Sequence, residues 1–152
     1  MEYKTLTGGI VAKYNDTYRC IVNHNAGFFS NCTVCLVDLI ESIAYFKNTN
    51  VELDTRNTFQ IYKNSEKNND IGFEYFKKTN NMKVDIIYEN GYKVETGMFI
   101  LPYKTLMVDK LTPYIKKYFS ESDKVKNIIS MMEKKYKIDY ENTCCVFFRG
   151  LD

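Results

Sequence analysis

Residues 19–46, RCIVNHNAGFFSNCTVCLVDLIESIAYF, decide the fold of this chain. Residues 19–22 predict a short strand, and residues 23–30 predict a loop in which Gly27 can take backbone angles closed to other residues. Ser30 or Asn31 is the predicted N-cap of a helix over residues 32–46. Apolar residues at three- and four-residue spacings give this helix one apolar face, formed by Leu36, Leu39, Ile40, Ile43 and Phe46.

The sequence on either side extends this strand–loop–helix unit. Residues 1–20 predict an irregular lead-in with a turn at residues 7–9. Beyond the helix, the pattern predicts a series of short elements: a strand over residues 51–54, turns and short helical pieces over residues 55–82, and a hairpin of strands 83–88 and 92–100.

Two helices and a strand are predicted in the last third of the chain. Thr112 as cap and Pro113 at the first helical position predict a helix to about residue 119. Ser122 is the predicted cap of a second helix, whose adjacent Met131 and Met132 are expected to fill the core. The apolar stripe of that helix consists of Val125, Ile128, Ile129, Met132 and Tyr136. Residues 143–148, TCCVFF, are a continuous apolar run of the kind found in buried strands of parallel sheets.

Alternating strands and helices predict one α/β domain over residues 1–152, Rossmann-like, with three layers and a mostly parallel sheet. In such sheets, ligands bind beyond the carboxyl ends of the strands. Two segments follow strands in this way, residues 23–30 and residues 149–152. We therefore expect both segments to face one pocket.

Length and composition restrict the class of protein. The 152 residues, 45% hydrophobic and 26% charged, suit one globular domain, and a net charge of +2 gives no electrostatic reason to expect nucleic acid. Five cysteines, an odd number, and the absence of a signal peptide in residues 1–20 favour free thiols in a reducing compartment. The expected location is the cytoplasm, of the host if the chain is viral. No run approaches the roughly 18 apolar residues that span a membrane.

Two segments carry candidate chemistry. The amides of residues 23–30 precede a helix and can bind an anion or a sugar hydroxyl, with a purely structural turn as the equal alternative. His24 is the only histidine, and a structural role is favoured over that of a general base. The guanidinium of Arg149 can bind a diphosphate, and Gly150 permits close approach of a ligand. The alternative is a structural Arg149 that caps the end of the domain or pairs with Asp152.

Three stretches, in order, resemble the uncharacterised fucosyltransferase-like glycosyltransferases of large DNA viruses and microbes. They are GFFSNCTVCLVDLIESIAYF, LDTRNTFQIYK and FFRGLD. The second contains an Asp-x-x-x-x-Phe-x-x-Tyr-Lys pattern, formed by Asp54, Phe59, Tyr62 and Lys63. The third is similar to the His-x-Arg-x-x-Asp motif of GDP-fucose-dependent fucosyltransferases, with Phe147 in place of the histidine.

The resemblance implies the N-terminal, acceptor-side half of a two-domain GT-B enzyme that is inverting and independent of metals and cofactors. Such an enzyme transfers a sugar from a nucleotide sugar such as GDP-fucose to a glycan or another hydroxyl acceptor. The donor-binding domain is expected as a separate or fused C-terminal partner, and the isolated chain is expected to be inactive. The implied site contains Arg149, Gly150 and Asp152 at the donor diphosphate, His24 or Asp54 as base, and Asn25, Gly27, Phe28, Phe29 and Ser30 along the cleft.

Two other functions remain open. The fold can serve as a non-catalytic interaction module derived from such an enzyme. Alternatively, Cys32 and Cys35 form a Cys-x-x-Cys pattern near a helix start, as in redox proteins. A zinc site is not expected, because the adjacent Cys144 and Cys145 would point to opposite faces of a strand.

Overall fold

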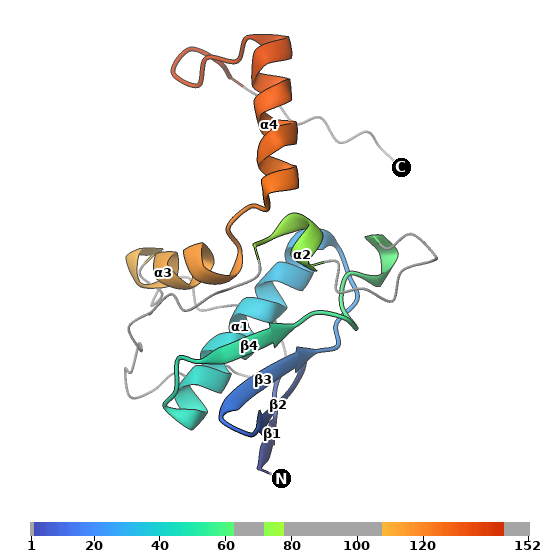
Figure 1. Ribbon diagram of the computed structural model, residues 1–152, viewed down its shortest axis with the longest axis vertical. Helices are drawn as coiled ribbons and strands as arrows, with labels where there is room; N and C mark the ends of the chain where they lie inside the picture. The colour runs from blue at the N-terminus through green and yellow to red at the C-terminus, as the bar shows by residue number, and fades with distance from the viewer. Residues whose placement is uncertain (1, 63–71, 78–107, 145–152) are drawn as a thin grey trace.

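The computed structural model describes residues 2–62, 72–77 and 108–144, which form a mixed α/β fold (Figure 1). Four strands make one sheet in the order β1-β2-β3-β4. In chain order the elements are β1 Tyr3–Thr5, β2 Gly9–Tyr14, β3 Thr17–Val22, α1 Phe28–Phe46, β4 Val51–Asp54, η1 Gln60–Tyr62, α2 Gly72–Tyr75, α3 Val108–Tyr118 and α4 Asp123–Tyr136.

The first three strands form an antiparallel meander, so the prediction of an irregular lead-in over residues 1–20 is wrong. Tyr14 pairs with Thr17 across a two-residue turn, in which Asn15 has a φ of 53°. Asparagine tolerates this left-handed region better than most residues. Polar residues at the turn and at the strand ends interrupt the alternation of polar and apolar residues that would indicate strands. These three strands are therefore recognised only from their pairing in the structure.

The strand, loop, helix and strand from β3 to β4 are confirmed. β3 and β4 are parallel, with Tyr18 opposite Val51 and Ile21 opposite Asp54, and α1 is the crossover between them. The other two pairings of the described sheet are antiparallel, so the sheet is mixed. The predicted hairpin over residues 83–100 and most of the predicted strand 143–148 lie outside the described residues.

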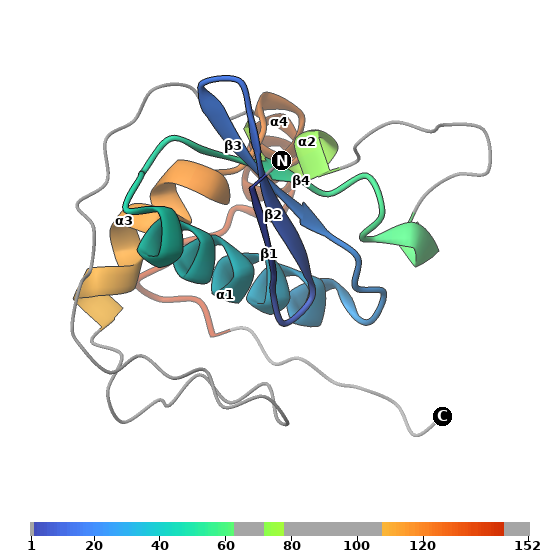
Figure 2. The ribbon, with the colours of Figure 1, turned by 90° about the horizontal axis from the view of Figure 1, so that it is seen from below.

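The core lies between α1 and one face of the sheet (Figure 2). Leu39 and Ile43 of the predicted helix face are fully buried, and Ile40 and Phe46 pack against the core from its edge. The sheet side of the core consists of Val11, Cys20, Val22 and Val51. The predicted apolar face of the helix is therefore confirmed, although the helix begins four residues earlier than expected, at Phe28.

Among the described residues, α1 is the one helix whose length and composition would allow it to cross a membrane. Half of it is buried inside the fold, and its polar residues Asn31, Asp38 and Ser42 are buried there as well. A helix that packs on a sheet in this way has the character of the core helix of a globular domain.

The turn between β1 and β2 rests directly on α1. The N–H of Gly8 donates to both carboxylate oxygens of the buried Asp38, at 3.0 and 3.2 Å. A Cβ on Gly8 would lie 2.1 Å from Cγ1 of Val34. Only glycine therefore allows the turn and the helix to approach this closely.

Helix α3 begins five residues before the predicted first position, so Pro113 lies inside it and not at its start. Tyr114 and Tyr118, one turn apart, are buried and join the core. The hydroxyl of Tyr118 donates to the carbonyl of Val51 at 2.8 Å, which ties α3 to β4.

Helix α4 has the predicted cap, because Oγ of Ser122 accepts from the N–H of Val125 at 3.3 Å. The expectation that Met131 and Met132 fill the core is wrong, since these side chains are 71% and 48% exposed. No residue of α4 is buried. In the described part of the chain α4 packs against the short helix α2 and otherwise stands away from the sheet (Figure 1), so its apolar stripe faces outward.

Candidate functional site

The carboxyl ends of β3 and β4 define one edge of the fold. β3 ends at Val22 and β4 at Asp54, and because the two strands are parallel, the loops that follow them start at the same edge. The first loop is residues 23–27 and the second is residues 55–59. The prediction that residues 23–30 follow the end of a parallel strand is thus confirmed. Its other half, with Arg149, Gly150 and Asp152, lies outside the described residues.

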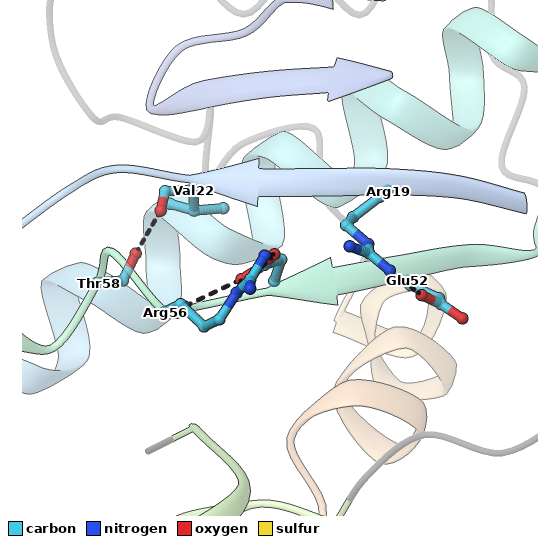
Figure 3. A network of polar contacts seen from close by, with 6 residues as sticks. Arg19, Val22, Glu52, Arg56 and Thr58 are labelled. Atoms are coloured by element: carbon cyan, nitrogen blue, oxygen red, sulfur yellow. Dashed lines mark hydrogen bonds and ion pairs between the residues drawn. The ribbon is translucent and has the colours of Figure 1, made fainter. Parts of the chain in front are cut away.

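Side-chain hydrogen bonds fasten the two loops to each other. The Asn25 amide donates to the carbonyl of Asn57 at 3.0 Å, and its oxygen accepts from the N–H of Gln60 at 2.9 Å. The buried hydroxyl of Thr58 donates to the carbonyl of Val22 at 2.9 Å (Figure 3). Asn25, expected to line a cleft, is thus used to hold the loops together.

An aromatic cluster fills the angle between the second loop and the start of α1. The centroid of the Phe28 ring lies 5.3 Å from that of Phe59, 5.6 Å from that of Tyr62 and 5.1 Å from that of Tyr75. The N–H of Phe28 also donates to the Tyr62 hydroxyl at 2.6 Å. Phe28 is therefore a packing residue, whereas Phe29 is 83% exposed and projects from the same turn.

A side chain within α1, that of Asn31, stabilises the start of this helix. Gly27 is the N-cap and no side chain caps the helix, so the predicted capping role of Ser30 or Asn31 is wrong. Instead the buried Asn31 accepts from the N–H of Ala26 at 3.0 Å and donates to its carbonyl at 3.1 Å. The φ of Gly27 is −57°, an ordinary value, so its conformational freedom is not used.

His24 lies at this edge, half-buried, with Nε2 3.1 Å from Oγ of Ser30. An imidazole beside a hydroxyl can exchange a proton with a ligand oxygen that reaches the pair. The pair joins the loop to the first turn of α1, where the positive end of the helix dipole favours negative charge.

The carboxylate of Asp54 is engaged by Arg56. Arg56 Nε lies 2.9 and 3.1 Å from the two oxygens of Asp54, and Nη2 lies 2.6 Å from the second. Burial on its own would raise the pKa of Asp54, but the hydrogen bonds and charge of Arg56 hold the pKa below its ordinary value. A carboxylate held in this way is a weak proton acceptor, so of the two candidate bases the geometry favours His24.

Asp54 also lies on the face of the sheet away from α1. The register places it beside Ile21, on the same face as the Arg19–Glu52 ion pair of 3.5 Å (Figure 3). Arg56 was not singled out from the sequence. Its position two residues after Asp54 is the signal that identifies the pair, because this spacing lets an arginine fold back on the carboxylate at a strand end.

Two of the described cysteines, Cys20 and Cys32, do not have the properties of redox thiols. Cys32 is the fifth residue of α1 and not at its N-terminus, and burial raises the pKa of its thiol to about 11. Burial likewise raises the pKa of Cys20 to about 12. Thiols of this kind are unreactive at neutral pH, which argues against a redox function. Within residues 2–62, 72–77 and 108–144 there is no cluster of three metal-ligating side chains.

Replacing Asn25 by alanine is expected to loosen the second loop. The variant loses both hydrogen bonds between the loops and about 1 kcal/mol of stability, and the amide proton of Gln60 should exchange faster with solvent. Hydrogen exchange followed by NMR measures this. Asn23→Ala is the matched control, because residue 23 is held through its backbone N–H to the Gly8 carbonyl at 2.8 Å. Equal Gln60 exchange in the two variants would show that Asn25 does not hold the loops together.

In comparisons with known proteins, no family model, no curated protein and no solved structure matches this chain.

Proposed function

We propose that this chain is the acceptor-side, N-terminal part of a fucosyltransferase-like enzyme that uses a nucleotide sugar as donor. One observation supports this above all. The two segments that carry the resemblance in the described residues, the Gly-Phe-Phe-Ser turn and the segment from Asp54 to Tyr62, fold against each other at the ends of two parallel strands. Crevices at such strand ends are where open α/β sheets bind ligands.

The proposed chemistry is glycosyl transfer with inversion. The oxygen of an acceptor hydroxyl forms a bond to the anomeric carbon of the donor sugar while the bond from that carbon to the diphosphate oxygen breaks. His24 takes the acceptor proton, and the nucleoside diphosphate leaves with the bonding electron pair. The hydrogen bond to Ser30 orients the imidazole for this step.

The other proposed roles follow from position and residue type. Phe29 presents an exposed ring beside the Gly27 turn, and such a ring is suited to contact the apolar face of a sugar. Arg149, Gly150 and Asp152 are proposed to bind the donor diphosphate, where a guanidinium offsets the charge that develops on the leaving group. Most donor contacts are assigned to a second, C-terminal domain, fused or separate.

The finer fold that goes with this function is a Rossmann-like domain with three layers. β4 is the last strand of the described sheet, so further parallel strands would join at its outer edge. The free thiols of Cys20, Cys32, Cys35 and Cys144 fit a reducing compartment, and we propose the cytoplasm as the place of action.

Acceptor binding is tested by saturation-transfer NMR on the full chain with a panel of soluble oligosaccharides. We expect binding that Phe29→Ala weakens about tenfold, which corresponds to roughly 1.4 kcal/mol of lost ring contact. Tyr3→Ala is the matched control, because Tyr3 is an exposed aromatic on β1, at the other side of the sheet. Equal losses in the two variants, or no saturation transfer to any oligosaccharide, would contradict the proposed acceptor site.

Calorimetry with GDP-fucose and other nucleotide sugars tests whether donor binding belongs mainly to the second domain. If a second domain makes most donor contacts, residues 1–152 on their own should bind every donor weakly and transfer no sugar. Nanomolar affinity for a nucleotide sugar would contradict that division of donor and acceptor binding.

An interaction module that has kept this fold without the chemistry is the second candidate. The outward-facing apolar stripe of α4 favours it, since an exposed apolar surface of this kind marks a contact with another molecule. The Phe29→Ala experiment separates the two, because a module of this kind would not bind the oligosaccharides.

A further inference from the structure

Gly8 makes hydrogen bonds to two different parts of the fold. Its carbonyl accepts from the N–H of Asn23 at 2.8 Å, and its N–H donates to both carboxylate oxygens of Asp38, at 3.0 and 3.2 Å. Asn23 is the first residue of the loop that follows β3, and Asp38 lies in the middle of α1. One glycine thus connects a buried carboxylate of the helix with the start of the candidate-site loop.

This arrangement departs from a regular antiparallel ladder. Gly9 of β2 is opposite Val22 of β3, so Gly8 and Asn23 form the next pair along the two strands. The residues of a hydrogen-bonded pair in such a ladder exchange two bonds, one from each N–H. Here only the bond from Asn23 is of this kind, because the N–H of Gly8 is donated to Asp38. The carboxylate therefore takes the hydrogen bond that the carbonyl of Asn23 would accept, and the ladder ends at this pair.

The bond between the turn and Asp38 is favourable for both partners. A buried carboxylate needs hydrogen-bond donors, and the N–H groups of Thr7 and Gly8 supply them. The charge of Glu41 on the same helix repels the carboxylate, so these amides are the donors that hold it. For the N–H of Gly8, an ionised oxygen is a stronger acceptor than a backbone carbonyl. The end of the ladder is therefore determined by the side chain of residue 38.

The loop leaves β3 at the peptide between Val22 and Asn23, and both polar groups of this peptide are engaged. The carbonyl of Val22 accepts from the hydroxyl of Thr58 at 2.9 Å (Figure 3), and the N–H of Asn23 donates to Gly8. His24 is the next residue of the chain. The orientation of this one peptide therefore sets the direction of the loop and the place of the imidazole.

We propose that Asp38 is a positioning residue of the candidate site, which ends the β2–β3 ladder at Asn23 and thereby places His24. Without an acceptor at residue 38, the N–H of Gly8 pairs with the carbonyl of Asn23, because a donor without a partner is costly, and residue 23 joins β3. The imidazole, one residue later, then moves away from Ser30. The inference rests on the proposed function only for the role of His24 as base, because the position of the loop is measurable whether or not the chain takes part in sugar transfer.

The test compares Asp38→Val with Asp38→Asn by NMR on the full chain at neutral pH. Valine fills much of the same space without an acceptor, whereas asparagine keeps an oxygen that can accept from Gly8. The nuclear Overhauser effect between the ring of His24 and the β protons of Ser30 should disappear in Asp38→Val and remain in Asp38→Asn. Coupling through the hydrogen bond from the Gly8 nitrogen should reach the carboxyl carbon of Asp38 in the unchanged chain, and the carbonyl carbon of Asn23 in the valine variant.

Ser42→Ala is the matched control, and circular dichroism checks the fold of each variant. Ser42 is buried on α1 like Asp38, and its hydroxyl donates to the Asp38 carbonyl at 2.6 Å, so its loss weakens the helix but removes no contact of the turn. The Overhauser effect should persist in this control.

The proposal is overturned if the effect survives in Asp38→Val, or if it is lost equally in Ser42→Ala or Asp38→Asn. If Asp38→Val does not fold, the unchanged chain decides, because a coupling there from the Gly8 nitrogen to the carbonyl carbon of Asn23 overturns the proposal as well. Failure of the unchanged chain to bind any oligosaccharide counts against the proposed function alone.

Discussion

Replacing Gly8 by alanine is expected to lower the free energy of unfolding by about 3 kcal/mol. The new Cβ would lie 2.1 Å from Cγ1 of Val34 and 3.1 Å from a carboxylate oxygen of Asp38. Both neighbours are fully buried, so neither can move aside without opening the contact between the β1–β2 turn and α1. Urea unfolding followed by circular dichroism measures the change.

The chain offers both a rescue and a control for this substitution. Val34→Ala removes the methyl group that clashes, so Gly8→Ala should cost about 1 kcal/mol or less in that background, a coupling of about 2 kcal/mol. Gly27→Ala should change stability by less than about 0.5 kcal/mol, because a Cβ on Gly27 meets nothing within 4 Å and its φ is −57°. An equal cost for Gly8→Ala in both backgrounds would show that Val34 is not the obstacle.

The contrast between Gly8 and Gly27 shows what the sequence could predict. The strand, loop and helix from residue 19 onward were predictable because their order follows from hydrophobic spacing within one short stretch. Gly27, the glycine singled out for its conformational freedom, has an ordinary φ of −57°. A glycine that the fold does require, Gly8, acquires its role from Val34 of α1, which lies 26 residues later in the chain. Spacing along the sequence does not reveal such a contact.

The same limit applies to the candidate site. The location of residues 23–30 at a strand end was predictable, because a loop after a β-strand and before a helix has few alternatives. The roles within the loop were not, because they depend on partners far along the chain. Asn25 is held by Asn57 and Gln60, and Phe28 by Tyr62, at separations above 30 residues.

The outward face of α4 shows the limit of periodicity itself. An apolar stripe predicts that one side of a helix avoids water but not what covers it. For α1 the cover is the sheet, and the stripe is buried as predicted. For α4 the stripe is equally regular, yet no residue of it is buried. Its sequence predicted the cap at Ser122 correctly, since capping depends on the next three residues alone.

The buried carboxyl of Asp38 is expected to make the stability of the fold depend strongly on pH. Burial raises the pKa of this carboxyl from 3.8 to about 6; the charge of Glu41 also raises the pKa, and hydrogen bonds from the N–H groups of Gly8 and Thr7 lower it. Burial also raises the pKa of Glu41, while the charge of Lys4 opposes that rise. A carboxyl whose pKa is raised by folding binds its proton more tightly in the folded chain. The contribution of the protonated Asp38 to the free energy of unfolding is therefore complete below about pH 4, and it is lost as the pH rises through about 6.

Replacing Asp38 by asparagine is expected to remove this loss. The asparagine oxygen can still accept from the N–H of Gly8, so the turn keeps its contact with α1. The difference in unfolding free energy between Asp38→Asn and the unchanged chain should shift by about 2 kcal/mol in favour of the variant between pH 4 and pH 7.5. Urea unfolding at a series of pH values measures it. Asp16→Asn is the control, since Asp16 is an exposed turn residue, and its profile should run parallel to that of the unchanged chain. A constant difference for Asp38→Asn across this range would mean that the buried carboxyl keeps its ordinary pKa, and that the turn is held by a charged group which burial does not penalise.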